Sequence, residues 1–383
     1  MLGKILIAVA VVFAFLVCGG IYLAHWAHQE LTRDAQVDKE KLQPRVIKGG
    51  EQFEKHDFYA GADVGEISEI LAGWPADREG AALTIVGNRG ALFLDANQRP
   101  VKEIRFSRTI FCPVEVSKID SSGDYGYLTR DESWSSPVIL FDRDGKERWS
   151  YSGGLLKGVD DSVSLGAEET TKSGVVVGFN GGGGLVLLDR QGKPIWQKPE
   201  SNVWHVETLD TNEDGHKEIL HSNAQGQLLV GNTNGDIIGR YLPGAYVSNF
   251  SITRWEDDPQ PTHILVPIKE GRDGGRPQLL VLDAGGKTVA ELDAPLGDLM
   301  HGVTGVSVHF GRNAEYYAAL MNKGHSRSIV LLYDKQRQIA YQEVLGESCF
   351  GITALPGRSG ERLLIGCSGR VVEYTRVAHS DER

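Results

Sequence analysis

The sequence has few of the features from which a function is usually assigned. Its 383 residues contain no run of lysines or arginines, and the formal net charge is −11. Because nucleic-acid binding depends on neutralising phosphates, we expect no nucleic-acid partner. The chain also lacks a G-x-S-x-G or H-E-x-x-H motif and any paired His/Cys metal spacing, so no catalytic motif supports an enzyme.

Long hydrophobic runs are also scarce, and the one that stands out lies at the N-terminus. Residues 5–24 carry no charge and are long enough to cross a bilayer as a helix. No clean small-x-small cleavage site follows, and Trp26 is placed for the membrane interface. We therefore expect an uncleaved signal-anchor over residues 1–28, with the N-terminus cytoplasmic and the bulk periplasmic or extracellular. A cleaved signal is the alternative. Lipidation of Cys18 is disfavoured because residues 15–17 lack the small residue it needs.

The rest of the chain divides into a short linker and a long repeat region. Residues 29–50 are charged and end in Gly-Gly, which predicts a stalk or linker. Beyond them, an aliphatic strand, a polar four-residue turn and an alternating strand recur, which is typical of a β-hairpin. These hairpins cover residues 92–106, 139–152, 186–199, 229–242, 280–293 and 331–344. Their spacing of about 43 to 51 residues is typical of four-stranded propeller blades.

Two further strands precede each hairpin, and seven such units align. We therefore predict an all-β fold over residues 51–383, a seven-bladed β-propeller of four-stranded blades. The seventh unit, ending at residues 362–377, lacks a fourth strand, and an unpaired edge is an aggregation hazard. The segment 51–61 is expected to supply that strand and close the ring. An open β-sandwich array is the alternative.

Two of the turns carry a longer pattern: an aspartate, a glycine three residues later and a tryptophan four residues beyond the glycine. The copies are Asp142, Gly145 and Trp149, and Asp189, Gly192 and Trp196. This pattern resembles the PQQ-like (quinoprotein-type) propeller repeat, and the resemblance covers most of residues 60–377. It implies the propeller fold, with each tryptophan docked on the next blade. A likeness of this kind is specific for architecture and weak for function.

The nonapeptide DTNEDGHKE, residues 210–218, resembles the calcium loop of integrin-type (FG-GAP/VCBS) propellers. In that interpretation the calcium ligands are Asp210, Asn212, Asp214, the carbonyl of His216 and Glu218. An EF-hand is excluded because His221 stands at the twelfth position and flanking helices are missing. The other blades do not repeat these ligands, and turns favour Asp, Asn and Gly without any metal. A polar turn is therefore the alternative, and any calcium would have a structural role.

Cysteine is scarce, with four residues in the chain. Cys349 and Cys367 flank the turn near residue 358 at nearly equal distances, so they would oppose each other on an antiparallel hairpin. A disulfide can form there if the pair is non-hydrogen-bonded, and an export compartment would allow it. Two buried thiols are the alternative. Cys112 is left over, and we expect it to be buried.

The resemblance to quinoproteins does not extend to their chemistry. Quinoprotein dehydrogenases are generally longer, with eight blades, and need a disulfide between adjacent cysteines, whereas no Cys-Cys pair occurs here. The glycine-rich stretch 178–189 joins two strands instead of opening a helix, so it is not expected to cradle phosphate. We therefore expect no PQQ and no catalytic residues.

The remaining candidates belong to one face of the predicted ring. Connections between blades, and between the two middle strands of a blade, fall on the face opposite the loop 210–218. This face is expected to carry Trp134, Trp204, His205, Tyr246, Arg272, Arg276, His301 and His325. Aromatic and arginine side chains favour contact with a protein or ligand, and ordinary packing residues are the alternative.

Together these patterns predict a membrane-anchored, extracytoplasmic propeller that acts as a non-catalytic protein-interaction scaffold. Its partner would be an envelope or extracytoplasmic protein, similar in style to the PQQ-like propeller that assists outer-membrane assembly. The alternative is an exported sensor of a small ligand, or a quinoprotein-like oxidoreductase, with its site at the centre of the ring.

Overall fold

The computed structural model describes residues 39–60, 63–108, 110, 113–118, 124–130, 137–154, 158–166, 174–258, 260–269, 275–311, 314–324, 326–358 and 360–377. The chain divides into a unit of residues 1–44 and a unit of residues 45–383. Within the described ranges, no helix has the length and apolar character needed to cross a membrane. The signal-anchor expected over residues 1–28 lies outside those ranges, as does the first part of the expected stalk.

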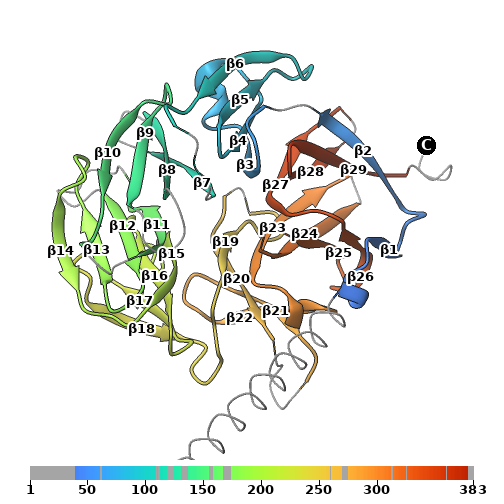
Figure 1. Ribbon diagram of the computed structural model, residues 1–383. Coiled ribbons are helices and arrows are strands. Elements are labelled where there is room, and N and C mark those ends of the chain that lie inside the picture. Colours follow the sequence, from blue (N-terminus) through green and yellow to red (C-terminus); the bar gives the residue numbers. More distant parts are fainter. Residues whose placement is uncertain are drawn as a thin grey trace, which may run out of the picture. The chain divides into compact units, whose positions relative to one another are not determined.

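Residues 45–383 form seven antiparallel sheets arranged in a ring (Figure 1). The predicted all-β, seven-bladed propeller of four-stranded blades is therefore confirmed. Neighbouring strands of a blade follow one another along the chain because short turns join them. The first strand of each blade lies at the centre of the ring and the last strand lies at its rim (Figure 1).

The blades are built from the following elements. Blade 1 contains β3 (Ile67–Ala72), β4 (Leu83–Gly87), β5 (Gly90–Leu94) and β6 (Pro100–Arg105), and blade 2 contains β7 (Val114–Lys118), β8 (Tyr125–Arg130), β9 (Val138–Asp142) and β10 (Glu147–Tyr151). Blade 3 contains β11 (Val159–Ser164), β12 (Val175–Phe179), β13 (Gly184–Leu188) and β14 (Pro194–Lys198), and blade 4 contains β15 (Val203–Leu209), β16 (Glu218–Asn223), β17 (Leu228–Gly231) and β18 (Ile237–Tyr241).

Blade 5 contains β19 (Ser251–Thr253), β20 (His263–Ile268), β21 (Gln278–Leu282) and β22 (Thr288–Asp293). Blade 6 contains β23 (Gly302–His309), β24 (Glu315–Lys323), β25 (Arg327–Tyr333) and β26 (Ile339–Leu345). Blade 7 contains β27 (Cys349–Pro356), β28 (Glu361–Cys367), β29 (Arg370–Arg376) and, from the start of the unit, β2 (Phe53–Ala60). Two short 3₁₀ helices, η1 (Ala76–Glu79) and η2 (Gly297–Leu299), lie in the loops.

The outer turns recur because one side chain closes each of them. Asp142 Oδ1 accepts hydrogen bonds from the backbone N–H groups of Asp144, at 3.0 Å, and Lys146, at 2.9 Å. Asp189 makes the equivalent pair of bonds in blade 3, and Asn232 does so in blade 4. Asp and Asn favour turns for this reason, which explains the period read from the sequence.

The tryptophans of the repeat dock on the following blade. The Trp149 indole N–H donates to the carbonyl of Arg190, at 3.1 Å, and Trp196 donates to Thr233, at 3.0 Å. The ring of Trp149 lies against Gly192, where φ is +76° and a Cβ would come within 2.7 Å of the indole. Glycine is therefore required there by both the backbone and the indole.

The ring closes through the N-terminal strand of this unit. β2 pairs antiparallel with β29 and forms the outer strand of blade 7, at the place expected for the segment 51–61. A second strand, β1 (Arg45–Lys48), pairs with β26 and gives blade 6 a fifth strand. Residues 45–48 were expected to belong to the linker, and the free edge of β26 explains the difference, because it offers unpaired backbone groups.

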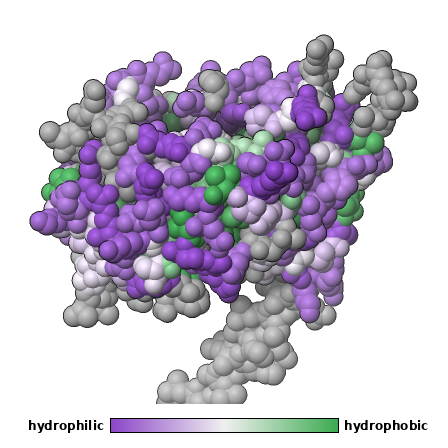
Figure 2. Space-filling model, turned by 90° about the horizontal axis from the view of Figure 1, so that it is seen from above, coloured by the Kyte–Doolittle hydropathy of each residue, from purple (hydrophilic) through white to green (hydrophobic). Residues whose placement is uncertain are grey.

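The core is distributed between the blades. Separate clusters of buried side chains fill the junctions of blades 1 and 2, 2 and 3, 3 and 4, 4 and 5, 6 and 7, and 7 and 1. The middle strands supply most of them and are almost completely buried, as in β4 and β5. Seen from the side, the surface is mainly hydrophilic with small separate hydrophobic groups (Figure 2).

Candidate functional site

The innermost strands of the blades enclose a central channel with a cavity of about 630 Å³. β3, β7, β11, β15, β19, β23 and β27 all contribute side chains to it. Because alternate residues of a strand point to opposite faces, each of these strands can place polar groups in the channel while it packs apolar groups between blades. The volume falls in the range of cavities that bind small molecules.

One wall of the channel is acidic. Glu69 lies on β3, Glu115 on β7, Asp161 on β11 and Glu207 on β15, so four consecutive blades each contribute a carboxylate to the channel. The opposite wall, formed by β23 and β27, contributes glycines and uncharged side chains, including Gly302, Gly305, Thr304, Gly351 and Thr353. The channel therefore has one negative side and one neutral side.

The single histidine of this wall neutralises one of its acids. His205 Nδ1 lies 2.6 Å from Asp161 Oδ2, which also accepts the backbone N–H of Val206 at 3.0 Å. Burial would lower the pKa of His205, but the attraction and hydrogen bond of Asp161 outweigh it and raise the pKa to about 10. Burial acts in the opposite sense on Asp161, and His205 overcomes it to lower the pKa of this carboxyl. The pair is therefore ionised at neutral pH.

Two other acids of the wall have no such counter-charge. Burial raises the pKa of Glu69 to about 7, although the N–H of Val116, 2.7 Å from its Oε2, opposes the shift. Burial also raises the pKa of Glu115 well above its usual value, and repulsion from Glu207, Glu69 and Asp161 adds to the effect. These carboxyls take up protons at a higher pH because burial disfavours their charged form, and the N–H of Val116 at Glu69 and the attraction of His205 at Glu115 offset only part of this effect.

These acids were not among the residues predicted from the sequence, although a signal for them was present. In blades 1, 3 and 4 the innermost strand has an irregularity immediately before one polar residue, and those residues are Glu69, Asp161 and His205. An ionisable side chain at the same place in three aligned strands indicates a shared environment. His205 was selected, but as a residue of the exposed face, whereas the structure places it in the channel against Asp161.

The loop 210–218 joins β15 to β16 and uses its acids to hold its own backbone. Asp210 Oδ2 accepts the N–H of Gly215 at 2.9 Å, and Asp214 Oδ1 accepts the N–H of His216 at 2.8 Å. Asn212 Oδ1 accepts the N–H of Asp214 at 2.9 Å. Glu218 Oε2 accepts both the N–H and the hydroxyl of Thr211, at 2.8 and 2.7 Å. Calcium at this loop stays a prediction.

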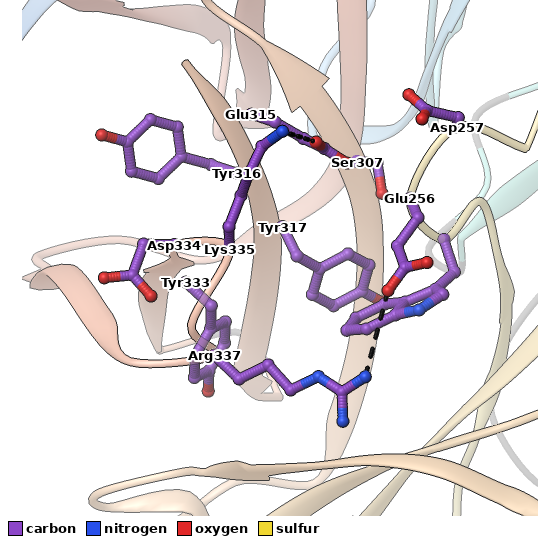
Figure 3. A pocket seen from close by; sticks show the side chains of 11 residues that line it. Glu256, Asp257, Ser307, Glu315, Tyr316, Tyr317, Tyr333, Asp334, Lys335 and Arg337 are labelled. Atoms are coloured by element: carbon purple, nitrogen blue, oxygen red, sulfur yellow. Dashed lines mark ion pairs between the residues drawn. The ribbon is translucent and has the colours of Figure 1, made fainter. Parts of the chain in front are cut away.

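A second cavity, of about 260 Å³, lies between the β19–β20 loop of blade 5 and residues of β23, β24 and the β25–β26 turn of blade 6 (Figure 3). Trp255 and Tyr317 meet there edge to face, with ring centroids 4.6 Å apart. The charged groups at its rim are already paired: Lys335 Nζ lies 2.8 Å from Glu315 Oε2, and Arg337 pairs with Glu256 (Figure 3). This arrangement leaves little unbalanced charge for a ligand.

Beside that cavity, Asp257, His309 and Glu315 bring three ligand atoms within 4.8 Å of one another. Within the described part of the chain, no other set of three His, Cys, Asp or Glu residues does so. His309 Nε2 lies 3.1 Å from Asp257 Oδ1, and Lys335 pairs with Glu315. Because the lysine supplies the positive charge that a metal would supply, we interpret the group as a surface ion-pair network.

The face that carries the connections between blades, called here the interblade face, presents an aromatic pair. The ring centroids of Trp204 and Tyr246 lie 5.9 Å apart, and the Tyr246 side chain is 59% exposed. Tyr246 packs against Gly226, where a Cβ would lie within 2.2 Å of the ring. This contact covers one part of the tyrosine and leaves the rest of it exposed.

A basic group accompanies the pair on the same face, on the loops of blades 5 and 6. Arg276 and His301, two of the residues expected on this face, are both exposed. Burial lowers the pKa of His301, and repulsion from Lys269 and Lys323 lowers it further. The histidine is therefore close to two lysines, Lys269 and Lys323.

Several predicted residues cannot be placed. Trp134, Arg272, His325 and Cys112 lie outside the described residues. Cys349 and Cys367 are described, and they form a disulfide bond between opposed positions of β27 and β28. Both residues are fully buried.

Comparison with known proteins supports the fold alone. No family model matches the chain, and no curated protein matches it. Among solved structures, it is similar to a chain of the crystal structure of BBS1N in complex with ARL6DN, with a TM-score of 0.51 and 12% identity over 88% of this chain and 98% of that one. It also aligns with the Pan2 WD40 domain of Neurospora crassa, at a TM-score of 0.48 and 12% identity, over 88% of this chain and 98% of that one.

Proposed function

We propose that this chain is a membrane-anchored, extracytoplasmic propeller of PQQ-like repeats that acts as a non-catalytic protein-interaction scaffold. The observation that carries the proposal is the interblade face, where exposed Tyr246 contacts half-buried Trp204 and where His301 lies close to two lysines. Tyrosine, tryptophan and arginine are enriched among the residues that dominate protein-protein binding. A partner would present an apolar pocket to Tyr246 and acidic side chains to the basic group.

Two further observations support parts of the proposal. The docking of Trp149 and Trp196 on the next blade supports the assignment to PQQ-like repeats. The Cys349–Cys367 disulfide supports an extracytoplasmic location, because disulfides persist in oxidising compartments. The solved structure of BBS1N holds a protein complex, and at 12% identity it contributes only the fold to the argument.

Crosslinking followed by affinity capture from membranes tests the scaffold function. We compare the wild type with Tyr246→Ala and, as a control, with Ile238→Ala, which removes another exposed side chain from the outer strand β18. We expect one recurrent partner with the wild type and the control, and at least about a fivefold lower yield with Tyr246→Ala, as for loss of a central contact residue. Equal recovery with Tyr246→Ala would place the interface elsewhere, and recovery of no partner would contradict the scaffold function.

Calcium binding at the loop 210–218 remains a proposal with its own test. Calorimetric titration of the purified chain with about 1 mM calcium should give heat that Asp210→Ala and Asp214→Ala abolish, as expected for oxygen ligands. Asp283→Ala is the matched control, because Asp283 closes an equivalent-looking polar turn by accepting the N–H of Lys287. Absence of heat and of any thermal shift in the wild type would make the loop an ordinary turn.

A second candidate function is a sensor that binds a small ligand in the channel, and the cavity of about 630 Å³ favours it. The oxidoreductase alternative is tested separately by incubation with pyrroloquinoline quinone and calcium. Absorbance of the bound cofactor together with dye reduction would support that alternative over the scaffold.

A further inference from the structure

The charges of the channel are not balanced by the residues that line it. Among the residues that the structure describes, its lining contains five carboxylates, from Glu69, Glu115, Asp160, Asp161 and Glu207. Against them stand His205, Arg130 and Arg254. His205 is paired with Asp161, and Arg254 pairs with Glu361 and donates to the carbonyl of Ser307. Arg130 attracts Asp160 and Asp161, so the acids of β3, β7 and β15 receive the least compensation.

Glu115 is the carboxylate without a partner. The side chain is half-buried and lines the channel at the centre of the acidic wall. Among the residues that the structure describes, it makes no hydrogen bond and no ion pair. Glu207, Glu69 and Asp161 repel it, and the attraction of His205, which is paired with Asp161, is weaker than each of these repulsions. Glu69, by contrast, bonds the backbone of the next blade, and Glu207 lies 3.5 Å from His205. A carboxylate that faces three other acids and has no ion-pair partner is costly to keep ionised, which indicates that a cationic group completes the site.

The geometry favours an organic cation over a metal ion. A single metal ion needs three or more ligand atoms close together, and within the described residues only the group at Asp257 meets that condition. The channel acids are instead spread over four blades. Apolar side chains lie among them, including Phe250, Ile252, Val303 and Ile352. An ammonium or guanidinium group on a hydrocarbon chain meets both conditions, since it donates several hydrogen bonds and its stem packs on apolar surface.

We propose that the channel binds an aliphatic amine or guanidine, with its cationic group at Glu115 and its hydrocarbon portion against the apolar lining. This inference goes beyond the scaffold function and holds whether or not a protein binds the interblade face. Two sources offer the same chemistry: a free polyamine, and a lysine or arginine side chain of a peptide. A cationic group from either source would bind through the carboxylates of the acidic wall.

Isothermal titration of the purified full-length chain tests the proposal. The probes are spermidine, as a free polyamine, and acetyl-Gly-Arg-Gly-amide, as a peptide-borne guanidinium, each at low ionic strength and pH 8. We expect saturable binding of at least one probe, and at least about a tenfold loss with Glu115→Gln, as expected for removal of a buried charge partner. The tighter probe identifies the source.

Two further variants separate the site from general surface charge. Glu291→Gln removes one negative charge from the exposed outer strand β22, so this variant has the same net charge as Glu115→Gln. The affinity of this variant for the probe should stay within about twofold of wild type. Glu207→Gln should weaken binding as Glu115→Gln does, and it serves if the first variant does not fold. We also expect binding to weaken from pH 8 to pH 6, because Glu69 takes up a proton near pH 7 and cation binding requires the ionised acid.

The following results would overturn the proposal. One is no heat with either probe at about 5 mM, a concentration far above the dissociation constant of a specific site. Another is equal affinity in wild type and Glu115→Gln, or equal weakening by Glu291→Gln. Heat from calcium or zinc chloride that Glu115→Gln abolishes, without heat from the organic probes, would assign the channel to a metal ion instead.

Discussion

The N-terminal strand should hold the ring together through one aromatic side chain. Phe53 of β2 belongs to blade 7 by pairing, but its ring packs into blade 6. It meets Phe310, Tyr316 and Tyr341 edge to face, with centroids 5.5, 5.3 and 5.4 Å away. Phe53→Ala removes all three contacts while it leaves the β2–β29 hydrogen bonds in place.

The size of the effect follows from burial. Phe53 is only 5% exposed, and truncation of a buried phenylalanine costs about 3 to 5 kcal/mol of the free energy of unfolding. An unfolding entropy of about 2.1 cal/mol/K per residue gives about 0.7 kcal/mol/K for the roughly 330 residues of the propeller. Division of about 4 kcal/mol by this entropy predicts a melting temperature lower by about 6 °C.

Thermal unfolding followed by near-ultraviolet circular dichroism, together with urea titration, measures both quantities. The control is Glu54→Ala on the same strand, where the side chain is 59% exposed and pairs with His56, so a change below about 0.5 kcal/mol is expected. A melting temperature of Phe53→Ala within 1 to 2 °C of wild type corresponds to a loss of only about 1 kcal/mol in the free energy of unfolding. That result would show that the aromatic contact of Phe53 does not hold the ring closed.

Three further predictions concern other parts of the ring. Gly192→Ala should lower the free energy of unfolding by at least about 2 kcal/mol more than Gly182→Ala. Both glycines have positive φ, but only at Gly192 would a Cβ lie against an indole. Equal losses of the free energy of unfolding in urea titrations would contradict this prediction. Glu115→Gln should raise the melting temperature more at pH 8 than at pH 5. The pKa of Glu115 is raised in the folded state, so its ionisation costs stability once the pH exceeds its pKa in the unfolded chain. A melting-temperature difference in thermal scans that does not depend on pH would refute the raised pKa. Cys367→Ser should reduce the free energy of unfolding by about 3 kcal/mol, because the disulfide closes a loop with a sequence separation of 18. In denaturant titrations of this variant, a reductant should have no further effect.

The sequence predicts the architecture well because the repeat depends on local chemistry. Each outer turn is closed by a single Asp or Asn, as at Asp142 and Asn232, and such turns are legible one at a time. The shortage of one strand at the C-terminal end pointed to the segment 51–61, which β2 occupies. β1 could not be found in this way, because four exposed residues carry no pattern and their pairing depends on the free edge of β26.

The channel could be predicted only in part. Propeller folding implies a central axis, and acids occur in four of the aligned inner strands. Which side chains face the axis depends on irregularities in β3, β11 and β15, each of which shifts the register, and a shift of one residue exchanges the two faces of a strand. The same uncertainty explains why His205 was assigned to the exposed face.

Closure by β2 also determines when the fold can be completed. The ion pair between Asp57 and Arg370 joins residues that are 313 positions apart in the sequence. It connects β2 and β29, which are neighbours in blade 7 but are the first and the last of its strands to be synthesised. During synthesis, blades 1 to 5 can form as their own hairpins emerge, but β1 and β2 have no partners until β26 and β29 have been made. Pairings over such a distance form slowly. The N-terminal strands therefore wait, exposed, through almost the whole of translation, and this interval is the period in which the chain is most open to chaperones and to mispairing with another copy.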